Sequence, residues 1–286
     1  MVRPVSVGFD GSAESLAAAV WAGREAVLRK VPLRVVYALE WRAGNLQFSP
    51  GASAQREWVE GRLEVAQEEL SQTHPDLAIE LERVPEPPVK VLIDAAHASA
   101  VLALGSRGLG VVQGFLLGSV SLPVVAHASR PIVVVRAPEV PAALAGDGPV
   151  VVSLGLDGPY GPLLGFAFEA AALRGAPLNV VQVREQAGDG TAVAAERDNN
   201  DLAEALRPCR EKWPAVEVSE RPSAGPVAPH LTEAAAHAAL LVVGRRKRRH
   251  KLGPVPGVRI GPVAHAVLHH ATCPVAVVPY GTAGPP

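Results

Sequence analysis

The fold is decided by the stretch Val5-Ser-Val-Gly-Phe-Asp10-Gly11-Ser12, an apolar run that ends in an Asp-Gly turn. A similar stretch, Val151-Val-Ser-Leu-Gly-Leu-Asp157-Gly158-Pro159, follows in the second half of the chain, with its aspartate 147 residues after Asp10. Further landmarks recur in the same order, among them an apolar run that ends in glycine at 101–105 and again at 240–244. Because such a long period reports two copies of one structural unit, the sequence predicts two similar domains.

Within each half, short runs rich in Val, Ile and Leu alternate with longer Ala-rich segments. This alternation is typical of βαβ units around a parallel sheet, and runs that are apolar on both faces indicate strands covered by helices on each side. The sequence therefore predicts an α/β fold of two flavodoxin-like or Rossmann-like domains, each a five-stranded, mainly parallel sheet flanked by helices. We expect strands near 4–9, 33–39, 78–84, 100–105, 132–136, 149–155, 178–183, 215–221, 239–244 and 274–278.

The helices of the first half are expected at 14–30, 53–71, 88–98 and 121–128. In the first of these helices, Leu16, Val20, Gly23 and Val27 follow spacings of four, three and four residues. Residues at these spacings lie on one face of an α-helix, which supports the helix assignment.

The segment from Ala137 to Gly148 is rich in Pro, Gly and Ala and has no hydrophobic period. A chain of 286 residues is long enough for two domains that each bury a core of their own. We therefore expect a first domain over 1–137, a linker over 138–148 and a second domain over 149–282.

The composition is that of a folded soluble protein, with 48% hydrophobic and 19% charged residues and a formal net charge of -1. The apolar runs are far shorter than the roughly 20 residues of a membrane-spanning helix, and no secretory signal precedes the first strand. We expect a cytoplasmic protein with no membrane partner, and the charge balance does not favour nucleic acid. Cys209 and Cys273, both in the second half, are expected to be buried thiols rather than a disulfide framework.

Asp10 is the first candidate for chemistry, because it stands where the first strand gives way to its helix and is followed by Gly11 and Ser12. Ligands of open parallel sheets bind outside the carboxyl ends of the strands, so an acid at this position faces the usual site. Asp-Gly-Ser is also an ordinary helix-capping turn, and that alternative stays open.

A stronger signal follows the fourth strand, where the sequence reads Gly105-Ser-Arg107-Gly108-Leu-Gly-Val-Val-Gln-Gly-Phe-Leu-Leu-Gly118-Ser119-Val120. Glycines let backbone amides approach a phosphate closely, and a helix N-terminus adds a favourable partial charge for an anion. The segment lacks the Gly-Lys-Ser/Thr ending of a Walker loop and the position of the Rossmann dinucleotide motif. It predicts a phosphate cradle of another type, with a flexible surface loop as the alternative.

The spacing Gly105-x2-Gly108-x9-Gly118-Ser119 resembles the nucleotide-binding pattern of the universal stress protein family, in its ATP-binding branch. The resemblance covers the chain as two modules and implies the adenine nucleotide alpha hydrolase-like fold. It further implies that Asp10 and the backbone of Ala38 line the adenine and ribose side, that the glycines and serines surround the phosphates, and that Arg107 is a charge partner. The ATP-binding residues expected in this way are Asp10, Gly11, Ser12, Ala38, Gly105, Arg107, Gly108, Gly118, Ser119, Val120 and Ser121.

The second half departs from this pattern. Lys247 occupies the position of the second glycine, and 17 residues rather than 13 separate Gly244 from Gly261. Pro262 stands where the first half has Ser119, and proline offers a phosphate neither a hydroxyl nor an amide hydrogen. We therefore expect one ATP site, in the first half, and a degenerate second domain. Whether Mg²⁺ accompanies ATP stays open.

Two further features of the second half have competing interpretations. The run from Arg245 to Lys251 holds six Lys or Arg and one His, which suits a phosphate-bearing partner or, as we favour, a solvated loop. His265 and His269 have the i, i+4 spacing by which a helix presents two metal ligands, and His270 follows. With no carboxylate at matching spacing, we favour packing or interface contacts for them and expect no metal site.

The resemblance implies a regulatory or stress-response protein in which bound ATP changes conformation or partner choice. No nucleophile and base are assembled around Asp10, so we do not expect efficient catalysis. A slow ATPase or nucleotidyl-transfer enzyme and an interaction scaffold without nucleotide remain the alternatives. The family also implies pairing through the last strands, 132–136 and 274–278, which would give an internal pseudo-dimer and leaves a homodimer open.

Overall fold

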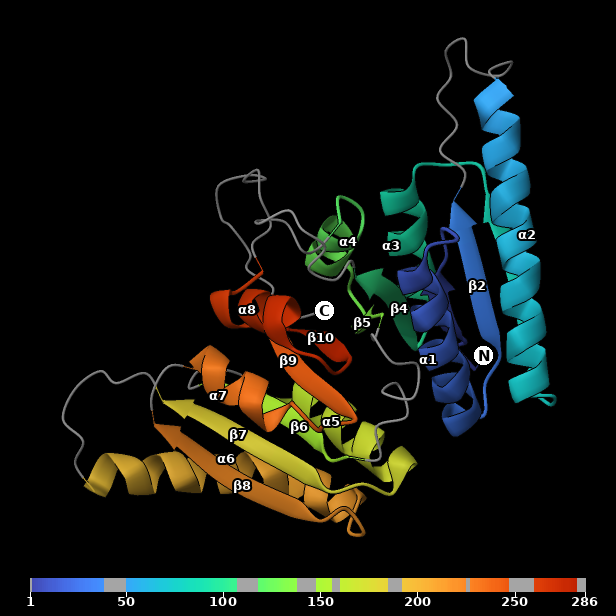
Figure 1. The fold of residues 1–286 in the computed structure, drawn as a ribbon. Coiled ribbons are helices and arrows are strands. Elements are labelled where there is room, and N and C mark those ends of the chain that lie inside the picture. Colours follow the sequence, from blue (N-terminus) through green and yellow to red (C-terminus); the bar gives the residue numbers. More distant parts are fainter. Residues whose placement is uncertain are drawn as a thin grey trace, which may run out of the picture. The chain divides into compact units, whose positions relative to one another are not determined.

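The computed structural model describes residues 2–38, 50–106, 118–137, 148–155, 160–184, 192–224, 227–246 and 260–281. The chain divides into two compact units, Met1–Leu144 and Ala145–Pro286, and both appear in Figure 1. Each unit is an α/β domain built on five strands.

The first unit alternates strands and helices along the chain, as the sequence predicted. Its strands pair in the order β3-β2-β1-β4-β5, and every pair in this sheet is parallel. The elements are β1 (Val5–Gly8), α1 (Ala13–Arg29), β2 (Leu33–Ala38), α2 (Pro50–Thr73), β3 (Ile79–Val84), α3 (Pro88–Ala98), β4 (Val101–Ser106), α4 (Ser121–His127) and β5 (Ile132–Arg136).

Helices cover both faces of this sheet. On one face, α1 packs against β1 and β4 and also contacts α2. On the other face, α3 packs against the same two strands and also contacts α4. All residues of β1 are buried, as are all but one of β4. This two-sided burial explains why both strands read as continuous apolar runs.

The buried side of α1 is lined mainly by small residues. Ala18, Ala22 and Ala26 are fully buried and Trp21 is 4% exposed, whereas Val27 is 45% exposed. The face through Leu16 and Val27 is therefore not the one that packs on the sheet. Small side chains occupy the buried side because they let the helix axis approach the strands closely.

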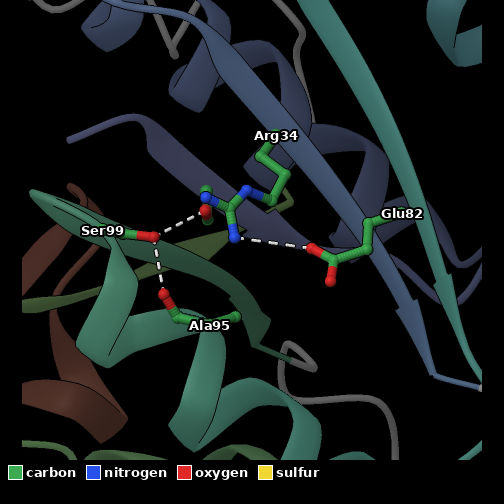
Figure 2. A network of polar contacts seen from close by, with 5 residues as sticks. Arg34, Glu82, Ala95 and Ser99 are labelled. Carbon is green, nitrogen blue, oxygen red and sulfur yellow. Dashed lines mark hydrogen bonds and ion pairs between the residues drawn. The ribbon is translucent and has the colours of Figure 1, made fainter. Parts of the chain in front are cut away.

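Polar side chains join β1 to the end of α3 inside the first unit. The hydroxyls of Ser6 and Ser99 lie 2.6 Å apart, and the Ser99 hydroxyl donates to the carbonyl of Ala95 at 2.6 Å. Figure 2 shows this cluster next to the Arg34–Glu82 ion pair, which spans 3.5 Å between β2 and β3. Both serines are fully buried, so satisfied hydrogen bonds are what makes them tolerable there.

The second unit repeats the plan, with the order β8-β7-β6-β9-β10 and parallel pairs throughout its sheet. The prediction of two five-stranded α/β domains is thus confirmed. One strand begins three residues later than expected, because the amide of Val216 donates to Trp213 in a turn. The elements are β6 (Val150–Leu154), α5 (Gly161–Arg174), β7 (Leu178–Arg184), α6 (Ala192–Lys212), β8 (Val218–Ala224), α7 (Val227–Ala234), β9 (Leu240–Arg246), α8 (Pro262–His270) and β10 (Val275–Tyr280).

Candidate functional site

The candidate site of the first unit lies at the carboxyl edge of its sheet, where the strand order reverses. From β1 the chain moves to β2 and β3 on one side, and it then crosses to β4 and β5 on the other. The register pairs Gly8 with Val36 and Val7 with Ala103, so the residues after β1 lie level with the ends of β2 and β4. This reversal opens the crevice in which parallel α/β sheets bind ligands.

A tight turn connects β1 to α1 at this edge. The amide and the hydroxyl of Ser12 both donate to Oδ1 of Asp10, at 3.0 and 2.5 Å. Ser12 itself is the N-cap of α1, and its hydroxyl accepts from the amide of Ser15 at 3.1 Å. Ser12 is therefore the capping residue of α1. Asp10 is exposed and supports the turn through one carboxylate oxygen.

Trp58 and Arg62, two residues of α2 that the sequence analysis did not single out, pack against this turn. Gly11 has a φ of 82°, which favours glycine, and a Cβ there would also lie 2.7 Å from the Trp58 ring. Nε of Arg62 donates to the Gly11 carbonyl at 3.2 Å, and its guanidinium lies 5.9 Å from the centre of the Trp58 ring. Trp58 is nevertheless 55% exposed. The sequence does carry a signal for Trp58, because it is the single aromatic residue among the charged positions of this helix.

On the other side of the crevice, the end of β4 meets the start of α1. A Cβ at Gly105 would lie 2.5 Å from the carbonyl carbon of Glu14 and 2.7 Å from the amide nitrogen of Ser15. Glycine at 105 is thus required by backbone packing, in addition to any part in ligand binding. Ala38 ends β2, and the backbone there is half-buried.

Residues 118–121 lie beside the end of β4. The hydroxyl of Ser121 donates to the carbonyl of Gly105 at 3.2 Å, which joins the first turn of α4 to the strand. The amide of Leu122 donates to the carbonyl of Gly118 at 3.2 Å, so the helical turn starts at Gly118. The amides of Ser119, Val120 and Ser121 precede Leu122, the first amide that donates within this turn, which leaves them for an outside acceptor. A Cβ at Gly118 would meet open space.

Arg136 is a further cation at this edge that sequence reasoning missed. It ends β5 and pairs in register with Ser106, the last residue of β4. Burial lowers the pKa of the Arg136 guanidinium, although an arginine in a protein stays protonated. Two other expected site residues, Arg107 and Gly108, lie outside the described residues.

A cavity of about 240 Å³ lies elsewhere in this unit, between α3 and the strands β2 and β3. Its charged groups pair with one another: Lys90 with Glu86 at 2.5 Å and with Asp94 at 3.2 Å, and Arg34 with Glu82. Since these charges are already matched, we do not place the candidate site there.

A family comparison agrees with the repeat. The model of the universal stress protein family matches residues 1–136 and, a second time, residues 149–279. This chain belongs to the universal stress protein family. It carries two family modules in tandem.

Relatives of similar length exist in mycobacteria. A universal stress protein of Mycolicibacterium smegmatis is 33% identical over 291 residues, which is 96% of each chain. A universal stress protein of Mycobacterium tuberculosis is 34% identical over 289 residues, again 96% of each chain. Among solved structures, a universal stress protein of Archaeoglobus fulgidus shares the fold with a TM-score of 0.71 at 19% identity, over 96% of this chain and 98% of that one.

The carboxyl edge of the second universal stress protein module is built differently. A Cβ at Gly244 would overlap the ring of Tyr280, so a tyrosine covers the strand end that corresponds to Gly105. The next residue, Arg245, is only 5% exposed, and Pro262 already belongs to the first turn of α8. Asp157 and Lys247 lie outside the described residues.

The described part of this universal stress protein contains neither a membrane-spanning helix nor a cluster of three metal ligands. No helix in that part is both long and apolar enough to cross a membrane. The same residues include no group of three or more His, Cys, Asp or Glu side chains arranged to hold a metal ion.

Proposed function

We propose that the first module binds ATP at the carboxyl edge of its sheet and that the protein has a regulatory or stress-response role. One observation carries the proposal: the hydrogen bond from Ser121 to Gly105 holds the start of α4 beside the strand reversal, across from the Asp10 turn. A nucleotide needs both an anion site and a base site within reach of each other. This edge offers candidates for both.

The phosphates are assigned to the β4–α4 side. The amides of Ser119, Val120 and Ser121 would donate to the phosphate oxygens, with Gly118 giving them room. Donors of this kind bind anions well because the amide dipoles are already oriented. Arg136 adds a positive charge at the neighbouring strand end. Arg107 and Gly108 are proposed as further contacts on the family pattern.

The adenine and ribose are assigned to the β1–β2 side. Asp10 is exposed, and we propose that it accepts hydrogen bonds from the ribose or the base, while the backbone of Ala38 contacts the adenine. The exposed ring of Trp58 forms a wall beside the same turn, held by its contact with Gly11. An aromatic ring fixed at such a place offers a stacking surface for a purine.

The second module is proposed not to bind ATP in this way. We propose that the Tyr280 ring, which packs against Gly244, and Pro262, which lacks the amide hydrogen that Ser119 has, keep a phosphate from this strand end. The pairing of the two modules through β5 and β10 into an internal pseudo-dimer, association into a homodimer, and a cytoplasmic location are proposed on the family pattern. Hydrolysis is not favoured, because the Asp10 carboxylate is engaged by the amide and the hydroxyl of Ser12 in the turn that starts α1.

Calorimetric titration of the full chain with ATP, with and without Mg²⁺, tests the proposal through the stoichiometry. We expect one site per chain. Ser119→Pro, which removes an amide donor, should abolish binding, whereas Ser119→Ala, which keeps the amide, should retain most of it. Two equal sites would overturn the assignment of the second module, and no binding would favour the scaffold alternative. Phosphate release above that of an Asp10→Ala control would point to a slow ATPase.

A further inference from the structure

Two histidine rings meet on the solvent side of α8. This helix buries Ala264, Val267 and Leu268 against its own module, whereas His265 is exposed and His269 half-buried. The i, i+4 spacing places the two rings one turn apart, and their centroids lie 4.2 Å apart with a tilt of 41°. The two Nε2 atoms are separated by 3.1 Å.

This separation is the one that a shared metal ion requires. With metal–nitrogen bonds of about 2.05 Å, nitrogens 3.1 Å apart subtend about 98° at the ion, between the square-planar and tetrahedral angles. We propose that His265 and His269 chelate a divalent transition-metal ion of the class that prefers imidazole, with Cu²⁺ bound more tightly than Ni²⁺ or Zn²⁺. Because the described residues offer no third ligand in a cluster, water completes the coordination.

The helix prepares this site in two ways. Packing of α8 against α7, β9 and β10 fixes the backbone that carries both rings, so little order is lost when an ion binds. His269 also lies in the last turn of the helix, where the partial negative charge of the macrodipole attracts a cation. A proton shared between the rings would occupy the place of the ion, and the two states can be told apart by experiment.

His270 provides a matched control on the same helix. It is exposed like His265, but its ring lies 6.5 Å from that of His269 and takes no part in the short contact. Replacing it changes the histidine content and the helix surface without removing either proposed ligand.

The test is calorimetry with Cu²⁺ alone, and separately with Ni²⁺, on the full chain purified without a polyhistidine tag and without nucleotide. We expect one tight ion per chain. His265→Ala and His269→Ala should each weaken binding by about 100-fold, because the second metal bond is then no longer intramolecular. His270→Ala should bind as the parent protein does. Electron paramagnetic resonance of the Cu²⁺ complex should show two imidazole nitrogens.

Thermal unfolding gives a second readout and guards against misfolded variants. Without metal, the His265→Ala and His270→Ala variants should unfold at the parent temperature, because both side chains are exposed. Added Cu²⁺ should then raise the unfolding temperature of the parent and of His270→Ala only. Equal Cu²⁺ affinity in His265→Ala and the parent, or an equal loss in His270→Ala, would overturn the proposal. Either result would leave the ATP proposal untouched.

Discussion

The hydroxyl of Ser121 donates to the carbonyl of Gly105 at 3.2 Å, so the first turn of α4 is tied to the end of β4. This bond spans 16 residues of sequence, and residues 107–117 between its ends lie outside the described part of the chain. It fixes where the amides of 119–121 stand relative to the sheet, and it gives the proposed phosphate site a defined position.

Ser121→Ala should therefore weaken ATP binding. Loss of one hydrogen bond of this kind costs about 1 kcal/mol, which corresponds to roughly a five-fold lower affinity if the bond positions the amides in the bound state. Calorimetric titration measures the change, and Ser129→Ala, at an exposed serine beyond the same helix, is the control. Equal affinities for the two variants would show that α4 is positioned by other contacts.

Trp58→Leu should lower the affinity for ATP by about 1–3 kcal/mol, the range found for base stacking on aromatic residues, whereas Trp58→Phe should lose less. The parent protein should show quenching of tryptophan fluorescence on ATP addition. Trp213 lies in the second module and stacks on Phe168 at 5.9 Å, so Trp213→Phe should leave the quenching in place. If ATP binds but Trp58→Leu binds equally well, only the stacking role fails.

Gly105→Ala and Gly118→Ala should separate the two roles of glycine at this edge. A methyl group at 105 collides with the backbone of Glu14, and forced overpacking of this type costs about 1–3 kcal/mol in the free energy of unfolding. The same change at 118 meets open space and should alter stability by less than about 0.5 kcal/mol. Urea unfolding of both variants measures the difference, and a Gly105→Ala protein of parental stability would contradict the packing role.

Cys273 should make the protein less stable at alkaline pH. Burial raises the pKa of this thiol to about 12, whereas the unfolded chain ionises near the ordinary value of 9.0. The folded state therefore keeps a proton that the unfolded state releases, and the free energy of unfolding falls as the pH rises from 9 toward 12. At pH 10 the loss relative to pH 7 is about 1.4 kcal/mol.

Urea unfolding at pH 7 and pH 10 tests this pH dependence. Cys273→Ala should remove the thiol's share of the decrease between the two pH values. Val277→Ala, at a buried apolar position of β10, lowers stability without removing a titrating group, so its decrease should match that of the parent. An unchanged decrease in Cys273→Ala would show that other groups cause the alkaline loss.

The central strands, such as β1 and β4, were predictable because they are buried on both faces, and continuous apolar runs such as Val101–Leu104 are the direct result of that burial. The buried face of α1 was not predictable. The closeness of β4 favours alanines on that face, and in the sequence alanine is a weaker hydrophobic signal than Leu16 or Val27. What decides such a position is the distance to a strand many residues away.

The residues of the candidate site also fall into a group that the sequence could predict and a group that it could not. The glycine spacing and Asp10 could be found because they are local patterns. Trp58 and Tyr280 could not, because their importance comes from what they contact: Gly11, 47 positions earlier, and Gly244, 36 positions earlier. Only the folded chain brings these partners together.

The tyrosine ring over Gly244 bears on how the protein would respond to rising nucleotide concentration. Two equivalent ATP sites in one polypeptide could influence each other and make binding cooperative. In the proposed arrangement, Tyr280 occupies the strand end of the second module, so the chain has a single ATP site. Saturation of an isolated chain should then follow a simple hyperbola, and any steeper dose dependence would have to arise from association between chains.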